Sequence, residues 1–170
     1  MNKIIYTEKG YGLHDAIRKA GFAIREENGE WLTSNNAADV QSIIDTYDEL
    51  GNTVAKIKAD IIAHAAKLRD KVGAGISPYE IAGWGRKIAE AEKFKLTGLD
   101  ADAPNLEAEA SKGGITVVEL ADKIIANSKK CASLESEIAG NSRFHRNAVA
   151  KCLSFDEAMK YDWSTGWPVV

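Results

Sequence analysis

Residues 116–152 read TVVELADKIIANSKKCASLESEIAGNSRFHRNAVAKC, and this segment decides the fold. At alternating intervals of three and four it carries one helix face, made of Val117, Leu120, Ile124, Asn127, Cys131, Leu134, Ile138, Asn141, His145, Ala148 and Cys152. This spacing is typical of a helix that packs against other helices. A continuous helix over the segment would be about 54 Å long, at about 1.5 Å per residue. We expect Gly140 to break or bend it.

Polar residues interrupt this seam at Asn127, Asn141 and His145, where burial without partners would be costly. One interpretation is that they set helix register or oligomeric state. The other is that they lie where the seam opens to water. A second seam, through Val54, Ile57, Ile61, His64 and Leu68, adds His64 to these polar seam residues. His64 and His145 could face each other, but a hydrogen-bonded core histidine is commoner than a metal ligand.

The first 50 residues predict a small β-α-β-β-α unit. Strands are expected at residues 3–7, 22–25 and 30–33, and the Asn28-Gly29 pair between the last two is a strong hairpin signal. Helices are expected over residues 13–20 and after Asn35 or Asn36, either of which can cap the second helix. A unit of this size is marginal alone, so we expect it to dock on another part of the protein.

Residues 51–161 predict an antiparallel helical bundle. Ser77-Pro78-Tyr79-Glu80 is a well-marked helix start, and the helix that follows should turn Ile81, Trp84 and Ile88 inward and end near Gly98. Shorter helices are expected over 105–112 and 155–161, with similar capping signals before residues 117 and 155. Helices with matching seams and short connections form bundles. The predicted fold class is therefore α+β and predominantly helical.

The last nine residues, 162–170, form a tail that contains Trp163 and Trp167 without helix or strand spacing. Two large indole rings must cover apolar surface. One interpretation is that the tail folds back on the bundle or on the amino-terminal unit. The other is that Trp163, Trp167 and the preceding Tyr161 dock a partner chain, since Trp and Tyr are favoured anchors at interfaces.

Composition excludes several function classes. The formal net charge of −3 argues against binding nucleic acid through its phosphates. No apolar run approaches the ~20 residues of a membrane span, so we predict no membrane insertion, and residues 1–6 do not resemble a signal peptide. Cys131 and Cys152 would lie about 31 Å apart on a straight helix, and they read as reduced thiols of a cytoplasmic protein.

Catalytic signals are weak, and we predict neither an enzyme nor a bound metal or cofactor. The three histidines lack HExxH spacing. Gly10-Tyr11-Gly12 lies between a predicted strand and helix, as a phosphate-binding loop would, but Asp15 follows and no Gly-Lys-Ser/Thr completes the motif. A small cytoplasmic enzyme or nucleotide-binding protein that uses this turn remains an alternative.

Several short stretches carry a resemblance: residues 3–8, 13–17, 20–21, 28–31 (Asn-Gly-Glu-Trp) and 40–48 (Val-Gln-Ser-Ile-Ile-Asp-Thr-Tyr-Asp). Together they resemble the start of small proteins encoded in bacteriophage tail gene clusters. Residues 80–91, Glu-Ile-Ala-Gly-Trp-Gly-Arg-Lys-Ile-Ala-Glu-Ala, resemble a domain of unknown function found in phage tail-fibre-associated and tail-fibre-assembly proteins.

The resemblance implies non-catalytic work, either as a virion tail accessory component or as a tail-fibre assembly chaperone. Its partner would be a fibre or baseplate component of the tail. The protein would act in the host bacterial cytoplasm during assembly, and a retained component would also be found in the virion tail. A self-assembling helical scaffold, with oligomeric state set by the polar seam residues, is the remaining alternative.

Overall fold

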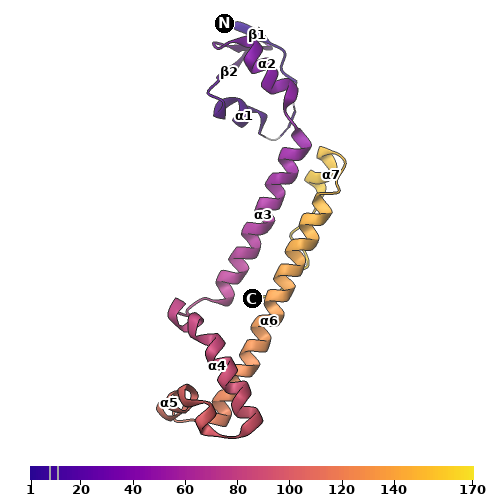
Figure 1. Ribbon diagram of the computed structural model, residues 1–170. Helices are drawn as coiled ribbons and strands as arrows, with labels where there is room; N and C mark the ends of the chain where they lie inside the picture. The colour runs from indigo at the N-terminus through magenta and orange to yellow at the C-terminus, as the bar shows by residue number, and fades with distance from the viewer. Residues whose placement is uncertain (8, 11) are drawn as a thin grey trace. The chain divides into compact units, whose positions relative to one another are not determined.

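The computed structural model describes residues 1–7, 9–10 and 12–170, and it confirms an α+β, predominantly helical fold (Figure 1). The elements in chain order are β1 (Asn2–Ile4), α1 (Leu13–Lys19), β2 (Ile24–Glu27), β3 (Glu30–Thr33), α2 (Ala37–Thr46), α3 (Glu49–Val72), α4 (Pro78–Thr97), the 3-10 helix η1 (Asp100–Asp102), α5 (Pro104–Gly113), α6 (Val117–Val149) and α7 (Phe155–Lys160). Among the described residues, no helix combines the length and apolar composition that crossing a membrane requires.

The chain forms two compact units, and each is assembled from two separate stretches. The first unit contains Met1–Ala63 and Arg143–Thr165, and the second contains His64–Ser142 and Gly166–Val170. Helices α3 and α6 therefore contribute residues to both units. The predicted division into an α+β unit (1–50), a helical bundle (51–161) and a tail (162–170) stays a prediction.

A three-stranded antiparallel sheet of order β1-β3-β2 organises the amino-terminal part of the first unit. The predicted turn is confirmed: Asn28 and Gly29 join β2 to β3 with φ of 53° and 80°, the positive values that a two-residue hairpin turn requires. β1 ends earlier than predicted, because the Ile5 amide donates to Gln41 Oε1 of α2 at 2.8 Å instead of continuing the ladder.

Two helices cover this sheet and complete a small apolar core. Asn36, rather than Asn35, caps α2 by accepting a hydrogen bond from the Ala38 amide. The core contains buried apolar side chains from β1, α1 and α2, namely Ile4, Leu13, Ile17, Val40 and Ile44. Tyr6 and Trp31 stack beside it with ring centroids 4.3 Å apart.

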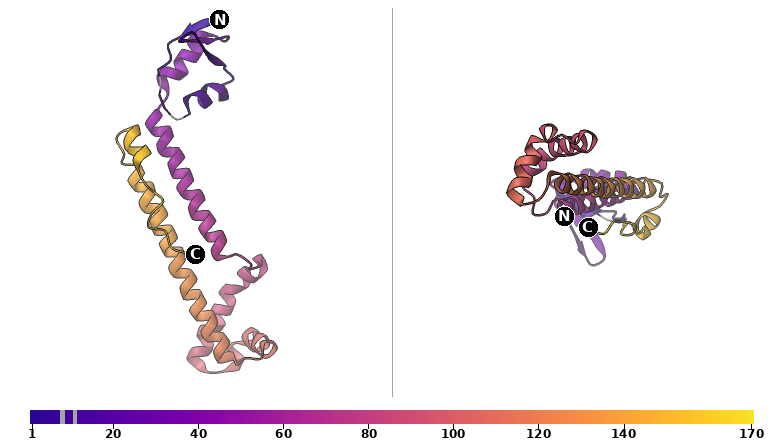
Figure 2. Two further views of the ribbon diagram at one scale, coloured as in Figure 1. Left: turned by 180° about the vertical axis from the view of Figure 1, so that it is seen from behind. Right: turned by 90° about the horizontal axis from the view of Figure 1, so that it is seen from below.

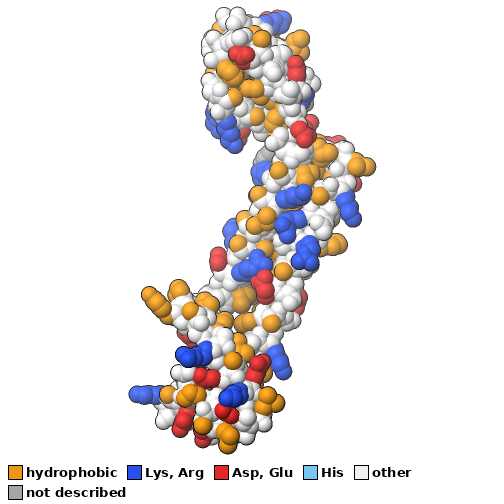
Figure 3. All heavy atoms as spheres, viewed as in Figure 1, with side chains coloured by type: hydrophobic (Ala, Val, Ile, Leu, Met, Phe, Trp, Pro, Cys, Tyr) orange, Lys and Arg blue, Asp and Glu red, His pale blue; other side chains and the backbone are white. Residues whose placement is uncertain are grey.

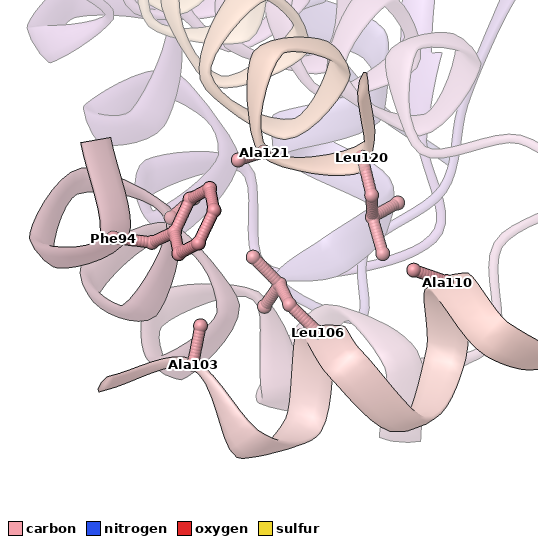
Figure 4. Packing of buried hydrophobic residues seen from close by; sticks show 7 residues of the cluster. Phe94, Ala103, Leu106, Ala110, Leu120 and Ala121 are labelled. Atoms are coloured by element: carbon pink, nitrogen blue, oxygen red, sulfur yellow. The ribbon is translucent and has the colours of Figure 1, made fainter. Parts of the chain in front are cut away.

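The second unit is built on α4, α5 and the first turns of α6 (Figure 2). Ser77 caps α4 by accepting from the Glu80 amide at 3.1 Å, and the helix ends at Gly98 with φ of 70°, both as predicted. Figure 4 shows the core that these helices share, in which Phe94 of α4 points toward side chains of α5 and α6. Its buried members are Ala91, Phe94, Ala103, Leu106, Ala110, Leu120 and Ala121.

Within the second unit, α6 packs antiparallel to α3 and to α4. Arg69 of α3 pairs with Glu135 of α6, whereas Ala65, one turn earlier, packs near Ile138. Likewise Trp84 of α4 lines the same cavity as Asn127 and Cys131 in the middle of α6, while Phe94 contacts the beginning of α6. This agrees with the predicted antiparallel arrangement of helices.

Of the break or bend expected at Gly140, the break is wrong, because α6 continues without interruption from Val117 to Val149; the bend stays a prediction. A glycine inside a helix costs roughly 0.5–1 kcal/mol relative to alanine. Burial of nearby apolar side chains such as Ile138, which is fully buried, offsets that cost. The helix stops three residues before Cys152, and Ser154 then caps α7 by accepting from the Glu157 amide at 3.2 Å.

Candidate partner-binding surface

In the first unit, His145, a buried histidine of α6, holds the part of the tail that ends at Thr165. His145 Nε2 lies 2.9 Å from the Thr165 carbonyl oxygen, which can only accept, so Nε2 carries a proton and donates. In the neutral ring, Nδ1 then accepts from the Tyr161 hydroxyl, 2.7 Å away. His145 therefore joins α6 to both ends of the segment 161–165.

The same segment contains a local turn. The Asp162 carboxylate accepts from the Ser164 amide at 2.9 Å and from the Ser164 hydroxyl at 2.6 Å. These hydrogen bonds hold the pKa of Asp162 below its ordinary value. Burial raises the pKa of Tyr161, with a smaller contribution from Cys152 and Asp162, so its hydroxyl stays protonated and able to donate at neutral pH.

In the second unit, Asn141 holds the next tail residue. Its side-chain Nδ2 donates to the Gly166 carbonyl oxygen at 2.6 Å. Gly166 has φ of 78°, a left-handed conformation that residues with side chains rarely adopt. Asn141 and His145 are separated by one helix turn, and they bond to the consecutive tail carbonyls of Gly166 and Thr165 respectively.

Trp167 folds back on the helices of its own unit. Its ring packs against the cluster formed by Ala65, Leu68 and Ile138. The His64 ring meets it edge to face, with centroids 4.8 Å apart. Most of the predicted site residues thus lie along the tail: His145, Tyr161 and Trp163 in the first unit, and His64, Asn141 and Trp167 in the second.

Trp163 borders a cavity of about 190 Å³ in the first unit. The cavity lies between the first turns of α3 and the segment 158–163, and its wall includes Thr53, Ile57 and Met159. Thr53 is buried, and its hydroxyl oxygen has no hydrogen-bond partner among the described residues. The proposed docking of a partner by Tyr161, Trp163 and Trp167 stays a prediction.

Asn127 is exposed and lies in a groove between α4 and α6. This α4–α6 groove consists of two adjoining cavities, of about 400 Å³ and about 390 Å³. Both are bordered by Ile76, Trp84, Asn127 and Cys131. The groove belongs wholly to the second unit.

This groove was not predicted from the sequence. Trp84 and Ile88 were expected to be covered, but both are only half-buried and line the groove. Ile81, also expected inward, is 45% exposed. The signal in the sequence was the apolar face of α4, which carries more large side chains than the neighbouring helices cover.

Charged residues border the groove as well as apolar ones. Lys87 of α4 pairs with Glu109 of α5 at 2.6 Å. Lys123 and Lys130 of α6 lie on the wall, and Lys123 is close enough to the Glu119 carboxylate to interact with it electrostatically. Figure 3 shows hydrophobic, basic and acidic side chains interspersed on the face it presents.

An exposed ion pair between α3 and α6 predicts a small pH dependence of stability in the second unit. Glu135 accepts two hydrogen bonds from Arg69, at 2.7 Å and 2.8 Å, and these lower the pKa of Glu135 from its ordinary value of 4.5. A lowered folded-state pKa stabilises the fold above the unfolded value, and the effect is lost as pH falls through the folded value.

We expect Glu135→Gln to lower the free energy of unfolding by about 0–1 kcal/mol at pH 7, since the pair is exposed. The difference from wild type should shrink as pH falls below 4.5. Urea unfolding of both proteins at pH 7 and at pH 3 measures it. An equal difference at the two pH values would contradict the assignment.

The described residues contain no group of three or more His, Cys, Asp or Glu side chains that could hold a metal ion. Cys131 and Cys152 are free, half-buried thiols. Burial, and to a lesser extent Glu157, raises the pKa of Cys152, which disfavours the reactive thiolate. Of the proposed nucleotide-binding turn, Tyr11 lies outside the described residues, so that alternative stays a prediction.

Comparison with protein-family models, with curated proteins and with solved structures finds no match to this chain.

Proposed function

We propose that this chain is a non-catalytic bacteriophage tail protein that binds another tail protein, a fibre or baseplate component. It acts as a tail accessory component of the virion or as a chaperone for tail-fibre assembly, in the host cytoplasm during assembly. The resemblance of residues 3–48 and 80–91 to tail-cluster proteins is what suggests the tail.

The observation that carries the binding role is the α4–α6 groove. Binding sites for ligands and helices are concave, mostly apolar and bordered by a few polar groups. The groove has this character, with Trp84 on the wall of both of its cavities. One side of the groove is formed by residues within 80–91, the stretch that resembles the tail-fibre-assembly domain.

A pull-down of the tagged chain from phage-producing cells, with purified particles analysed in parallel, tests this proposal. We expect stable recovery of a fibre or baseplate protein, which the tag alone does not recover. Presence in particles at fixed stoichiometry would identify a virion component, and absence from them a chaperone. Recovery of the chain alone would contradict the proposal and favour the self-assembling scaffold.

A further inference from the structure

We infer that the cavity between α3 and the segment 158–163 binds a neutral phenol ring, either a free small molecule or the tyrosine side chain of another protein. The wall of this cavity belongs to the first unit, whereas the α4–α6 groove belongs to the second. The inference therefore goes beyond the proposed function and does not depend on it. Three properties of the cavity support this ligand: an unpaired buried hydroxyl, an aromatic wall of suitable size, and a rim without net charge.

The first property is the hydroxyl of Thr53, which lies on the cavity wall. Thr53 is 2% exposed, and its Oγ1 has no hydrogen-bond partner among the described residues. A buried hydroxyl in this state costs stability. Threonine in a helix has two accessible χ1 rotamers, so this hydroxyl is able to turn toward a ligand. Because a hydroxyl both donates and accepts, a ligand hydroxyl completes it in either direction.

The second property is an apolar and aromatic wall whose size fits one ring. Apart from Thr53 and the charged rim, the lining residues are Ile57, Ala158, Met159, Tyr161 and Trp163. An engineered cavity of about 150 Å³ binds benzene, so a cavity of about 190 Å³ has room for one ring and one further polar atom. Tyrosine and tryptophan rings pack favourably against another ring, and so does a methionine thioether.

The aromatic part of the wall is fixed before a ligand arrives. The Tyr161 hydroxyl bonds to His145 Nδ1 at 2.7 Å. Asp162 and Ser164 close a turn that includes Trp163. A preformed site loses little binding free energy to the ordering of its own side chains. A small ligand with few contacts therefore binds measurably.

The third property is a rim without net charge. The charged side chains on the wall are Lys56 and Asp60, and they pair with each other at 2.9 Å. Among the residues described on the wall, no second charge is left to balance an ionised ligand. A neutral ligand avoids the cost of removing an ion from water. The rim therefore favours a phenol over a carboxylate or an amine.

Nuclear magnetic resonance of the full chain with ¹³C-labelled methionine methyl groups tests the inference. The chain has two methionines, of which Met159 lines the cavity and Met1 does not. Titration with p-cresol should shift the Met159 signal saturably and leave the Met1 signal unchanged. Toluene, which lacks only the hydroxyl, should bind about fivefold more weakly, the usual effect of one lost hydrogen bond. A cavity that holds water alone predicts no saturable shift.

A valine variant locates the hydrogen bond. Thr53→Val removes the unpaired hydroxyl and nearly keeps the shape of the side chain, so the variant should fold, and it should bind p-cresol no more tightly than toluene. Thr46→Val makes the same change at an exposed position of α2 outside the cavity, and should keep the fivefold preference. Equal binding of the two probes by wild type, equal shifts of both methionines, no saturable shift, or an unchanged preference in Thr53→Val would overturn the inference.

A second pair of probes distinguishes the two sources of the phenol. N-acetyl-tyrosinamide and N-acetyl-phenylalaninamide repeat the comparison with a peptide backbone attached to the ring. Preference for the tyrosine derivative identifies the side chain of another protein as the ligand, whereas binding of p-cresol without it identifies a free phenol. Both results support the phenol site. A pull-down that recovers no tail protein contradicts the proposed function and leaves this site standing.

Discussion

Replacing Phe94 by alanine is expected to destabilise the second unit by about 3–5 kcal/mol, the usual cost of removing a buried aromatic side chain. Phe94 is 6% exposed and fills the space between α4, α5 and the start of α6 (Figure 4). Its neighbours include several alanines, which are too short to collapse into the cavity that the substitution leaves.

Leu96 provides a matched control on the same helix, because it is 87% exposed. Leu96→Ala should change the free energy of unfolding by no more than about 0.5 kcal/mol. Urea unfolding followed by circular dichroism compares both variants with wild type. Similar effects of the two substitutions would show that this cluster is not the core of the second unit.

Replacing His145 by alanine is expected to destabilise the first unit by about 2–3 kcal/mol, because it leaves buried polar groups without partners. His145 is 4% exposed. Its ring forms hydrogen bonds with Tyr161 and Thr165, the two ends of the segment 161–165. Without the ring, the hydrogen bonds that join α6 to Tyr161 and Thr165 are lost.

Phe144 is the matched control, adjacent on the same helix but 64% exposed. Phe144→Ala should leave stability within about 0.5 kcal/mol of wild type. Hydrogen exchange of the amides of residues 161–165 gives a second readout, which should accelerate in the His145 variant alone. Unchanged exchange there would refute the role of His145 as the attachment of the tail.

Local structure was predictable wherever neighbouring residues satisfy one another. The helix starts at Ser77, Thr116 and Ser154 were expected from capping signals, and each side chain accepts the predicted amide hydrogen bond. The Asn28-Gly29 turn was expected from its tolerance of positive φ. These features depend on residues within about one turn of each other, so the sequence specifies them directly.

Features that depend on distant residues were predicted less well. The polar residues of the α6 seam were noted, but the partners of Asn141 and His145 lie 16 to 25 positions away, at Tyr161 and in the tail. The expected break at Gly140 ignored the packing on either side of it. Ile81 was expected inward but is 45% exposed, because helical spacing alone does not show whether a partner face is long enough to cover a residue.

By itself, the sequence determined the order of elements, the hairpin, the helix starts and the predominantly helical class, because caps, turns and apolar periodicity act over a few residues. The tertiary structure decided that His145 and Asn141 hold the tail, and that Trp167 packs on Ala65, Leu68 and Ile138. It also decided that Trp84 lines an open groove. Such outcomes depend on which surfaces meet across long sequence separations, and a one-dimensional pattern does not encode the space left between them.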